Sequence, residues 1–396
     1  MTAAHAGHAI TGVALANCLG VDNGTVFERA FAGVDSFSPG SAYFDFPFET
    51  ALGILPSLPP AELDAAPTRL AAVALASVRQ LRPTVRAAVD RWGGDRVAYV
   101  FASSTGGLEH TERALAPHPR LPATAAYRYA DHSIDATSAA IAHDLGVTGI
   151  TMALSTACSS SFKALASAMR LIDRGLADAV VVGSADSLCR TTVFGFHSLG
   201  LTAPTATQPF GRDRCGITLG EGSAYIVIER EVDATRRHAI ARVAGIGAAS
   251  DAFHHTSPHP EGLGGQLCMR QALDRAGMTP NEIDLVSAHG TGTKLNDAAE
   301  AAALARVFER RVPLTATKSL TGHTLGSAGL TSLVLAIESL RRQEIPATLR
   351  ATPVDDALGM AVVDKLTPAR LQHVLVNAFG FGGSNASVVV SQPRRP

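Results

Sequence analysis

Three strand-and-turn patterns occur twice in this chain, in the same order each time. Each pattern combines a run of β-branched and apolar residues with a turn rich in glycine and other small residues. The paired segments are residues 97–106 and 283–292, residues 179–185 and 374–380, and residues 220–228 and 382–390. One such pair is common in any large α/β protein, whereas three in the same order indicate a duplication. The sequence therefore predicts two related halves, residues 1–235 and 236–396.

Strand-like runs alternate with Ala- and Leu-rich stretches along both halves. The expected strands are residues 97–102, 150–154, 179–183, 224–229, 283–287, 373–377 and 386–391, and the expected helices are residues 68–80, 160–174, 266–276, 297–309 and 327–342. This alternation is typical of a parallel or mixed sheet covered by crossover helices. With 46% apolar and only 17% charged residues, the chain can also bury a large core. We therefore expect a globular α/β fold.

Charge and cysteine content exclude several classes of protein. The 34 basic and 35 acidic residues give a formal net charge of −1, so no overall field favours nucleic acid or an anionic membrane as partner. No apolar run approaches the roughly 20 residues that cross a bilayer, and the N-terminal segment does not resemble a signal peptide. The five cysteines show no CxxC spacing, which indicates a reducing compartment. We expect a cytoplasmic protein without a membrane span.

Cys158 lies at a predicted strand-to-helix turn. An apolar strand ends at Leu154, small residues follow, and an amphipathic helix begins near Ser159. The N-terminus of a helix favours thiolate over thiol, and its free N–H groups can stabilise an oxyanion. The alternative role is that of a small buried apolar residue, which we expect for the other four cysteines. The turn makes Cys158 the candidate nucleophile.

Two histidines lie beside glycines in segments of small residues. His289 belongs to SAHGTGT at residues 287–293, and His323 belongs to TKSLTGHTLGSAG at residues 317–329, which also contains Lys318. Such a backbone lets a ligand approach an imidazole closely. Either histidine alone could be an ordinary hydrogen-bonded residue. Together with a candidate nucleophile, they favour a Cys-His-His centre.

A metal site is not expected. Neither histidine segment has the closely spaced second ligand that zinc sites use. His254, His255 and His259 are near one another, but the prolines among them indicate an irregular surface loop.

Residues 377–385, NAFGFGGSN, follow a predicted strand and are unusually rich in glycine. This segment can bring a backbone N–H close to a substrate, and Phe379 is large enough to obstruct a cavity. The alternative is a glycine-rich hairpin corner packed by two phenylalanine side chains. Both interpretations place the segment at the end of a strand.

Together these segments resemble the β-ketoacyl-acyl-carrier-protein synthase family, of the elongating class with a Cys-His-His triad. The resemblance covers nearly the whole chain, from residues 10–12 to residues 382–385. It implies a thiolase-like fold, with two βαβαβαββ halves in five layers, α-β-α-β-α. It also implies an acyltransferase that joins an acyl chain to malonyl-acyl carrier protein by decarboxylative Claisen condensation. No cofactor would be bound, and the phosphopantetheine arm of the acyl carrier protein would carry the substrate.

The resemblance also assigns roles to individual residues. Cys158 would accept the acyl chain, while His289 and His323 would promote decarboxylation and hold the resulting enolate. Lys318 and Glu300 match the charged residues that support these histidines.

A second group of positions would contact the substrate. The backbone N–H groups of Cys158 and Phe379 would form the oxyanion hole, and the Phe379 ring would be the gate to the acyl cavity. Thr291 and Thr293 would bind the phosphopantetheine arm. The remaining substrate-binding positions are Phe210, Thr256, Phe381 and Leu108.

Three positions depart from the family pattern, namely Gly211, Cys215 and Gly292. They leave the chemistry intact but favour a specialised synthase, building polyene or polyketide-like chains, over housekeeping fatty-acid elongation. Two other functions are considered: a chain-length-controlling partner subunit, which typically lacks the nucleophile, and a thioesterase-like acyl-transferring enzyme. The expected assembly is a homodimer, or a heterodimer with a related synthase-like subunit.

Overall fold

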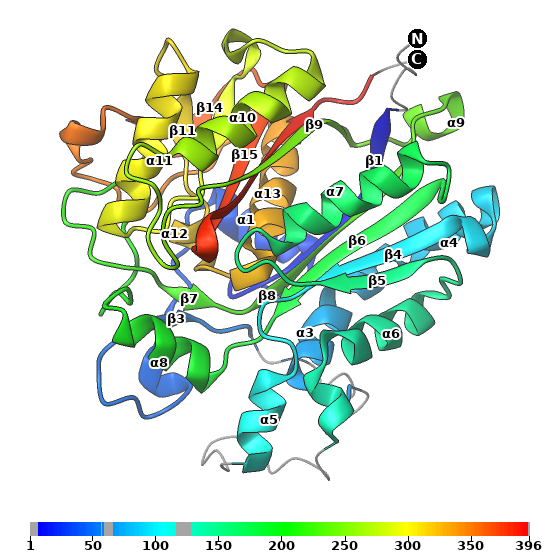
Figure 1. Cartoon of the computed structure of the whole chain (residues 1–396), viewed down its shortest axis with the longest axis horizontal. Coiled ribbons are helices and arrows are strands. Elements are labelled where there is room, and N and C mark those ends of the chain that lie inside the picture. Colours follow the sequence, from blue (N-terminus) through cyan, green and yellow to red (C-terminus); the bar gives the residue numbers. More distant parts are fainter. Residues whose placement is uncertain (1–6, 57, 59–65, 116–127, 395–396) are drawn as a thin grey trace.

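The computed structural model describes residues 7–56, 58, 66–115 and 128–394, which form one eleven-stranded mixed sheet with helices on its faces (Figure 1). The strand order is β13-β11-β10-β15-β16-β9-β1-β8-β6-β4-β5. The strands before residue 231 are β1 (His8–Ala16), β4 (Val97–Ala102), β5 (Thr151–Leu154), β6 (Ala179–Asp186) and β8 (Gly222–Arg230). The later strands are β9 (Ala241–Ser250), β10 (Leu285–Ser287), β11 (Pro313–Thr315), β13 (Ala361–Val362), β15 (His373–Gly380) and β16 (Ser384–Ser391).

Strand pairing is mirrored about the contact between β1 and β9. On one side β4 pairs in parallel with β5 and β6, and β6 pairs antiparallel with β8. On the other side β10 pairs in parallel with β11 and β15, and β15 pairs antiparallel with β16. The three repeated sequence patterns fall on β4 and β10, β6 and β15, and β8 and β16. Each pair therefore occupies matching places in the two parts of the sheet.

Helices cover the sheet on both sides and also fill the space between its two parts. They are α1 (Asn23–Phe31), α3 (Arg69–Val78), α4 (Arg82–Trp92), α5 (Leu108–Leu115), α6 (Ile134–Leu145), α7 (Ser160–Asp173), α8 (Arg190–Ser198), α9 (Asp233–Arg236), α10 (Leu263–Ala276), α11 (Lys294–Val307), α12 (Lys318–Thr321) and α13 (Ala328–Arg342). Short strands complete the fold: β2 (Ser38–Pro39), β3 (Ala51–Gly53), β7 (Leu219–Gly220), β12 (Glu344–Ile345) and β14 (Thr367–Pro368). Within the described ranges, each helix is too short or too polar to span a bilayer.

The layers follow from what each helix packs against. Helices α3, α4 and α6 lie on the outer face of the first set of strands, and α10 lies on the outer face of the second set, with α11 against it. Helices α7 and α13 contact each other and strands of both sets. Residues 328–340 of α13 are all buried, as a helix enclosed between layers requires. The order α-β-α-β-α is the thiolase-like arrangement expected from the sequence.

Candidate active site

Cys158 lies in the turn between β5 and α7, as predicted. Ala157 directly before it has φ = 52°, a left-handed conformation that residues other than glycine rarely adopt. The Ser160 hydroxyl accepts the N–H of Thr156 at 2.8 Å and donates to the carbonyl oxygen of Ala157 at 2.5 Å. These contacts fix a sharp turn that presents the sulfur just before the first turn of α7.

The prediction that the helix N-terminus makes Cys158 acidic is wrong. Burial raises the pKa of the thiol to about 11, although the charge of Lys318 and a backbone N–H from Phe381 both lower it. The free-energy cost of removing a thiolate from water is larger than the stabilisation by the partial charge of the helix terminus. The resting residue is a thiol at neutral pH, so the thiolate must form during the reaction.

His323 faces the sulfur from the segment between α12 and α13. Its Nε2 lies 3.1 Å from Sγ of Cys158, and its Nδ1 accepts the backbone N–H of Leu325 at 3.0 Å. Because Nδ1 is an acceptor, the neutral ring carries its proton on Nε2. The imidazole therefore donates a hydrogen bond toward the sulfur and the space beside it.

His289 follows strand β10 and lies beside His323, with ring centroids 5.4 Å apart. Lys318 Nζ lies 3.2 Å from Nδ1 of His289 and donates to its backbone carbonyl oxygen at 2.5 Å. Glu300 accepts the backbone N–H groups of His289 and Gly290 at 2.8 and 2.9 Å. Lys318 and Glu300 thus hold the His289 loop, and the Lys318 contact leaves the ring proton of His289 on Nε2.

Both imidazoles are neutral at physiological pH. Burial lowers the pKa of each well below its ordinary value, and the charge of Lys318 lowers it further. Burial also lowers the pKa of Lys318 to about 8, against the opposing effect of Glu300. The site therefore offers two neutral N–H donors rather than imidazolium ions.

The two phenylalanines of the glycine-rich segment have different surroundings. Phe379 lies within β15 opposite Asn385, and its ring packs against His289 with centroids 6.0 Å apart. Phe381 directs its backbone N–H at the Cys158 sulfur, and its ring packs against Phe196 at 5.3 Å. Of these two residues, Phe381 is the one whose backbone N–H contacts the sulfur, whereas the predicted oxyanion donor was Phe379.

A cavity of about 170 Å³ joins these groups. The predicted residues in its wall are Cys158, His289, His323, Phe379, Phe381, Thr256, Thr291 and Thr293. The hydroxyl oxygens of Thr291 and Thr293 lie 3.0 Å apart. Residues from both parts of the sheet thus meet at one enclosed space, with the sulfur and both imidazoles at its surface.

Two of the described residues predicted to bind substrate, Phe210 and Leu108, lie outside this wall. Phe210 is wholly buried beneath the His289 loop, and its backbone N–H donates to Asp297 at 2.8 Å. Leu108 is the first residue of α5, which packs against α3 and the short helix at residues 129–132. The Phe210 side chain thus packs behind the loop, beside Gly290, and does not reach the cavity wall.

The sequence did not single out three other residues that support the site, Asp186, Asn377 and Phe196, although Asn377 lies in the glycine-rich segment. Asp186, at the end of β6, is wholly buried and accepts hydrogen bonds from residues 103–105 and from the N–H of Ser327. It ties the loop after β4 to the start of α13, beside the His323 segment. Asn377 donates to Glu300 at 3.0 Å. Phe196 of α8 adds an aromatic ring to the cavity wall.

Two family models match the chain. Beta-ketoacyl synthase, N-terminal domain, matches residues 70–234, and Beta-ketoacyl synthase, C-terminal domain, matches residues 240–352. The chain belongs to the β-ketoacyl synthase family. Membership makes it an enzyme of the condensing acyltransferase type, as the sequence predicted.

Individual relatives agree with the family assignment. The 3-oxoacyl-(acyl-carrier-protein) synthase 2 of Vibrio cholerae is 34% identical over 261 residues, which cover 62% of this chain and 63% of that protein. The protein of the same name from Staphylococcus aureus strain N315 is 30% identical over 312 residues, covering 74% and 75% of the two chains. The matches to the V. cholerae protein thus span a little under two thirds of its length.

Solved structures share the fold of this synthase. The complex of a ketosynthase (ApeO) with its chain length factor (ApeC) from Xenorhabdus doucetiae contains a chain with a TM-score of 0.89 and 34% identity, covering 98% of both chains. The ishigamide ketosynthase/chain length factor gives a TM-score of 0.85 at 27% identity, covering 98% of this chain and 100% of that one. These likenesses confirm the thiolase-like architecture.

Proposed function

We propose that this synthase condenses an acyl group held on Cys158 with a malonyl group on an acyl carrier protein, releasing carbon dioxide. The observation that carries the proposal is the joint position of the Cys158 sulfur and the Nε2 atoms of two neutral histidines at one cavity. A chain-length-controlling subunit needs no such nucleophile. A thioesterase-like enzyme needs no second imidazole donor.

The first step is acyl transfer. The sulfur of Cys158 attacks the thioester carbonyl of the incoming acyl chain, and the bond from that carbon to the carrier's sulfur breaks. The proton of the Cys158 thiol passes to the departing phosphopantetheine thiol, so the exchange consumes no net proton. The backbone N–H groups of Cys158 and Phe381 are placed to stabilise the oxyanion.

The second step is decarboxylation. The malonyl thioester carbonyl accepts hydrogen bonds from Nε2–H of His289 and of His323. As the bond to the carboxylate breaks and carbon dioxide leaves, its electron pair moves into an enolate held by these donors. The enolate carbon attacks the Cys158 thioester, and Cys158 leaves as a thiolate that takes a proton from water. Holding both reactants in one cavity removes most of the entropic cost.

The wall of the cavity suits a phosphopantetheine arm. Thr256, Thr291 and Thr293 line it, and their hydroxyls can hydrogen-bond the amides of such an arm. The relatives from Vibrio cholerae and Staphylococcus aureus are named for the acyl carrier protein. We infer that the carrier protein supplies both substrates to this chain.

A paired subunit is supported by the exposed edge of the sheet. Strand β5 is the last strand in the order, and Met152 on it is 39% exposed, as is the neighbouring Ile150. An open edge with apolar side chains favours pairing with another chain. The neighbour from Xenorhabdus doucetiae is itself a ketosynthase with its chain length factor. We propose a homodimer, or a heterodimer with a related synthase-like subunit.

The mirrored strand order supports residues 1–235 and 236–396 as the two duplicated halves.

All five cysteines are free thiols, which supports a reducing, cytoplasmic setting. Fatty-acid elongation and a polyene or polyketide-type pathway both use this reaction, and the chain-length-factor complexes among the neighbours favour the second.

The test is a condensation assay with acyl- and malonyl-acyl carrier protein, in which mass spectrometry measures the β-ketoacyl product on the carrier. The wild type should form it, and Cys158→Ala should abolish it. His323→Ala should impair decarboxylation while leaving some acylation of Cys158. Condensation by Cys158→Ala at the wild-type rate would show that the nucleophile is misassigned.

A further inference from the structure

Helix α8 supplies part of the cavity wall beside the nucleophile. Phe196 on this helix and Leu199 at its C-cap both line the cavity. The Phe196 ring packs against Phe381, whose backbone N–H reaches the Cys158 sulfur. The position of α8 therefore sets how much room lies beside the sulfur.

Aromatic contacts hold the later part of α8, where Phe194 packs against three phenylalanines and His197 stacks on Phe48. The start of the helix has weaker support from its own residues. Its sequence, RTTVFGFHS, contains β-branched residues and a glycine, which are weaker helix formers than Ala or Leu. Val193 is buried, but most of the helix is exposed or half-buried. Cys189 at the N-cap gives no side-chain capping bond, and its sulfur lies 2.8 Å from the hydroxyl oxygen of Thr192 in the first turn. The first N–H groups of α8 need acceptors from elsewhere.

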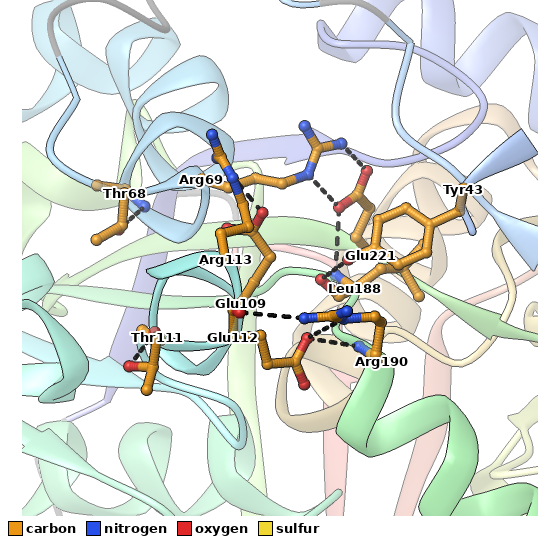
Figure 2. Close-up of polar contacts among 12 residues, drawn as sticks. Tyr43, Thr68, Arg69, Glu109, Thr111, Glu112, Arg113, Leu188, Arg190 and Glu221 are labelled. Atoms are coloured by element: carbon orange, nitrogen blue, oxygen red, sulfur yellow. Dashed lines mark hydrogen bonds and ion pairs between the residues drawn. The ribbon is translucent and has the colours of Figure 1, made fainter. Parts of the chain in front are cut away.

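Glu112 on α5 provides these acceptors (Figure 2). Its Oε2 accepts the backbone N–H of Arg190 at 2.8 Å, and its Oε1 accepts that of Thr191 at 2.6 Å. The Arg190 guanidinium donates in return to the carbonyl oxygen of Glu112 at 3.1 Å. The negative charge also complements the helix dipole. One carboxylate from another element thus caps α8.

The residues just before α8 belong to the same polar cluster. Glu221, paired with Arg69, accepts the N–H of Leu188 at 3.2 Å. The Tyr43 hydroxyl donates to the carbonyl oxygen of Leu188 at 2.8 Å (Figure 2). Because Leu188 is held on both its N–H and its carbonyl side, the Glu112 contact with the first turn then sets the direction of α8.

We propose that Glu112 is a positioning residue for the Phe196–Phe381 pair, and that it thereby selects which acyl chains reach Cys158. That the substrate is an acyl group rests on the proposed function. The effect of Glu112 on access to the Cys158 sulfur does not. Without the cap, α8 shifts away and the wall beside the sulfur opens. Long substituents then gain more than short ones.

Alkylation of Cys158 by N-ethylmaleimide and by N-octylmaleimide tests this directly. Peptide mass spectrometry gives the rate at residue 158, and the exposed Cys215 is an internal standard in the same chain. In Glu112→Ala, the octyl-to-ethyl rate ratio at Cys158 should rise about five-fold. This factor corresponds to the free energy of about 1 kcal/mol that a helix cap typically contributes. An unchanged or lower ratio would overturn the proposal.

Three further variants separate positioning from general damage. Asp22→Ala removes the carboxylate cap of α1, which has 9 residues like α8, and should leave the ratio unchanged. Glu112→Gln keeps one acceptor oxygen and should give an intermediate ratio, which decides the matter even if the alanine variant fails to fold. The single variant Phe196→Ala should itself raise the octyl-to-ethyl ratio. The double variant Phe196→Ala/Glu112→Ala should then give the same ratio as Phe196→Ala. Additive effects would contradict action through Phe196.

The same variants should be acylated by carrier-bound chains of increasing length. Glu112→Ala should shift acylation toward longer chains, by about the same factor as in the maleimide ratio. If the wild type accepts no acyl chain, the proposed function fails while the maleimide ratio still decides the role of Glu112. If the wild type is acylated but neither measurement changes in Glu112→Ala, the positioning role alone is wrong.

Discussion

The sulfur of Cys158 lies 3.1 Å from Nε2 of His323, yet burial raises the pKa of its thiol to about 11. Because only the thiolate reacts with iodoacetamide, the alkylation rate at residue 158 should climb about tenfold per pH unit from pH 7 to 10. Peptide mass spectrometry over this range measures it, with Cys215 reporting on the reagent. A plateau near pH 7 would show a thiolate already present in the resting enzyme.

Lys318 acts on both histidines through its charge. Its Nζ lies 3.2 Å from Nδ1 of His289, and after burial its charge is the largest cause that lowers the pKa of either imidazole. In Lys318→Met the pKa values of both should rise toward the ordinary value, so each ring protonates at higher pH than in the wild type. NMR of protein with ¹³C-labelled histidine follows the titration. Unchanged titration would contradict an electrostatic role.

The sequence grouped Cys158, His289 and His323 in one site, and the structure brings them together. It did not show which of two phenylalanines directs its backbone N–H at the sulfur. Phe379 and Phe381 lie in the same glycine-rich run, and only the turn after β15 decides which N–H faces the sulfur. The acidity of Cys158 was mispredicted for a related reason. A helix terminus is visible in the sequence, whereas burial depends on segments far away in the chain.

Among the elements, the central strands β1 and β9 were not predicted. Both are rich in alanine and glycine, which have low strand propensity. The glycines of β9 have a tertiary reason: a Cβ at Gly247 would lie 1.9 Å from the carbonyl oxygen of Cys268 on α10. Because α10 packs so closely on β9, these positions require glycine. The β-branched residues that usually identify a strand in a sequence are therefore missing there. The strands of the repeated patterns were confirmed, and each of them contains valine or isoleucine in an apolar run.

Gly380, the last residue of β15, lies against the turn that carries Cys158. A Cβ there would lie 3.0 Å from the carbonyl oxygen of Ser384 and 3.3 Å from the backbone nitrogen of Cys158. Gly380→Ala should push the Phe381 N–H away from the sulfur and slow acylation by about 10²-fold, the typical effect of losing one oxyanion donor. Gly24→Ala in α1 is the matched control. Equal acylation rates for both variants would argue against Phe381 as the donor.

At the scale of the whole molecule, the duplicated pattern predicted the mirrored sheet, and the histidines from one part meet the cysteine of the other. The exposed edge strand β5 is the proposed contact between two subunits. Met152→Lys should place a charge on that edge and shift the synthase from dimer to monomer. Sedimentation velocity measures the change. Identical sedimentation of wild type and variant would place the subunit contact elsewhere.

The acyl-enzyme itself is the most direct measurement. Intact-protein mass spectrometry after incubation with acyl-carrier proteins should show one added acyl group, located at residue 158 by peptide mapping. That mass should disappear when malonyl-carrier protein is added, as the β-ketoacyl product forms on the carrier. An acyl group on a residue other than Cys158, or none with any carrier-bound chain, would contradict the account.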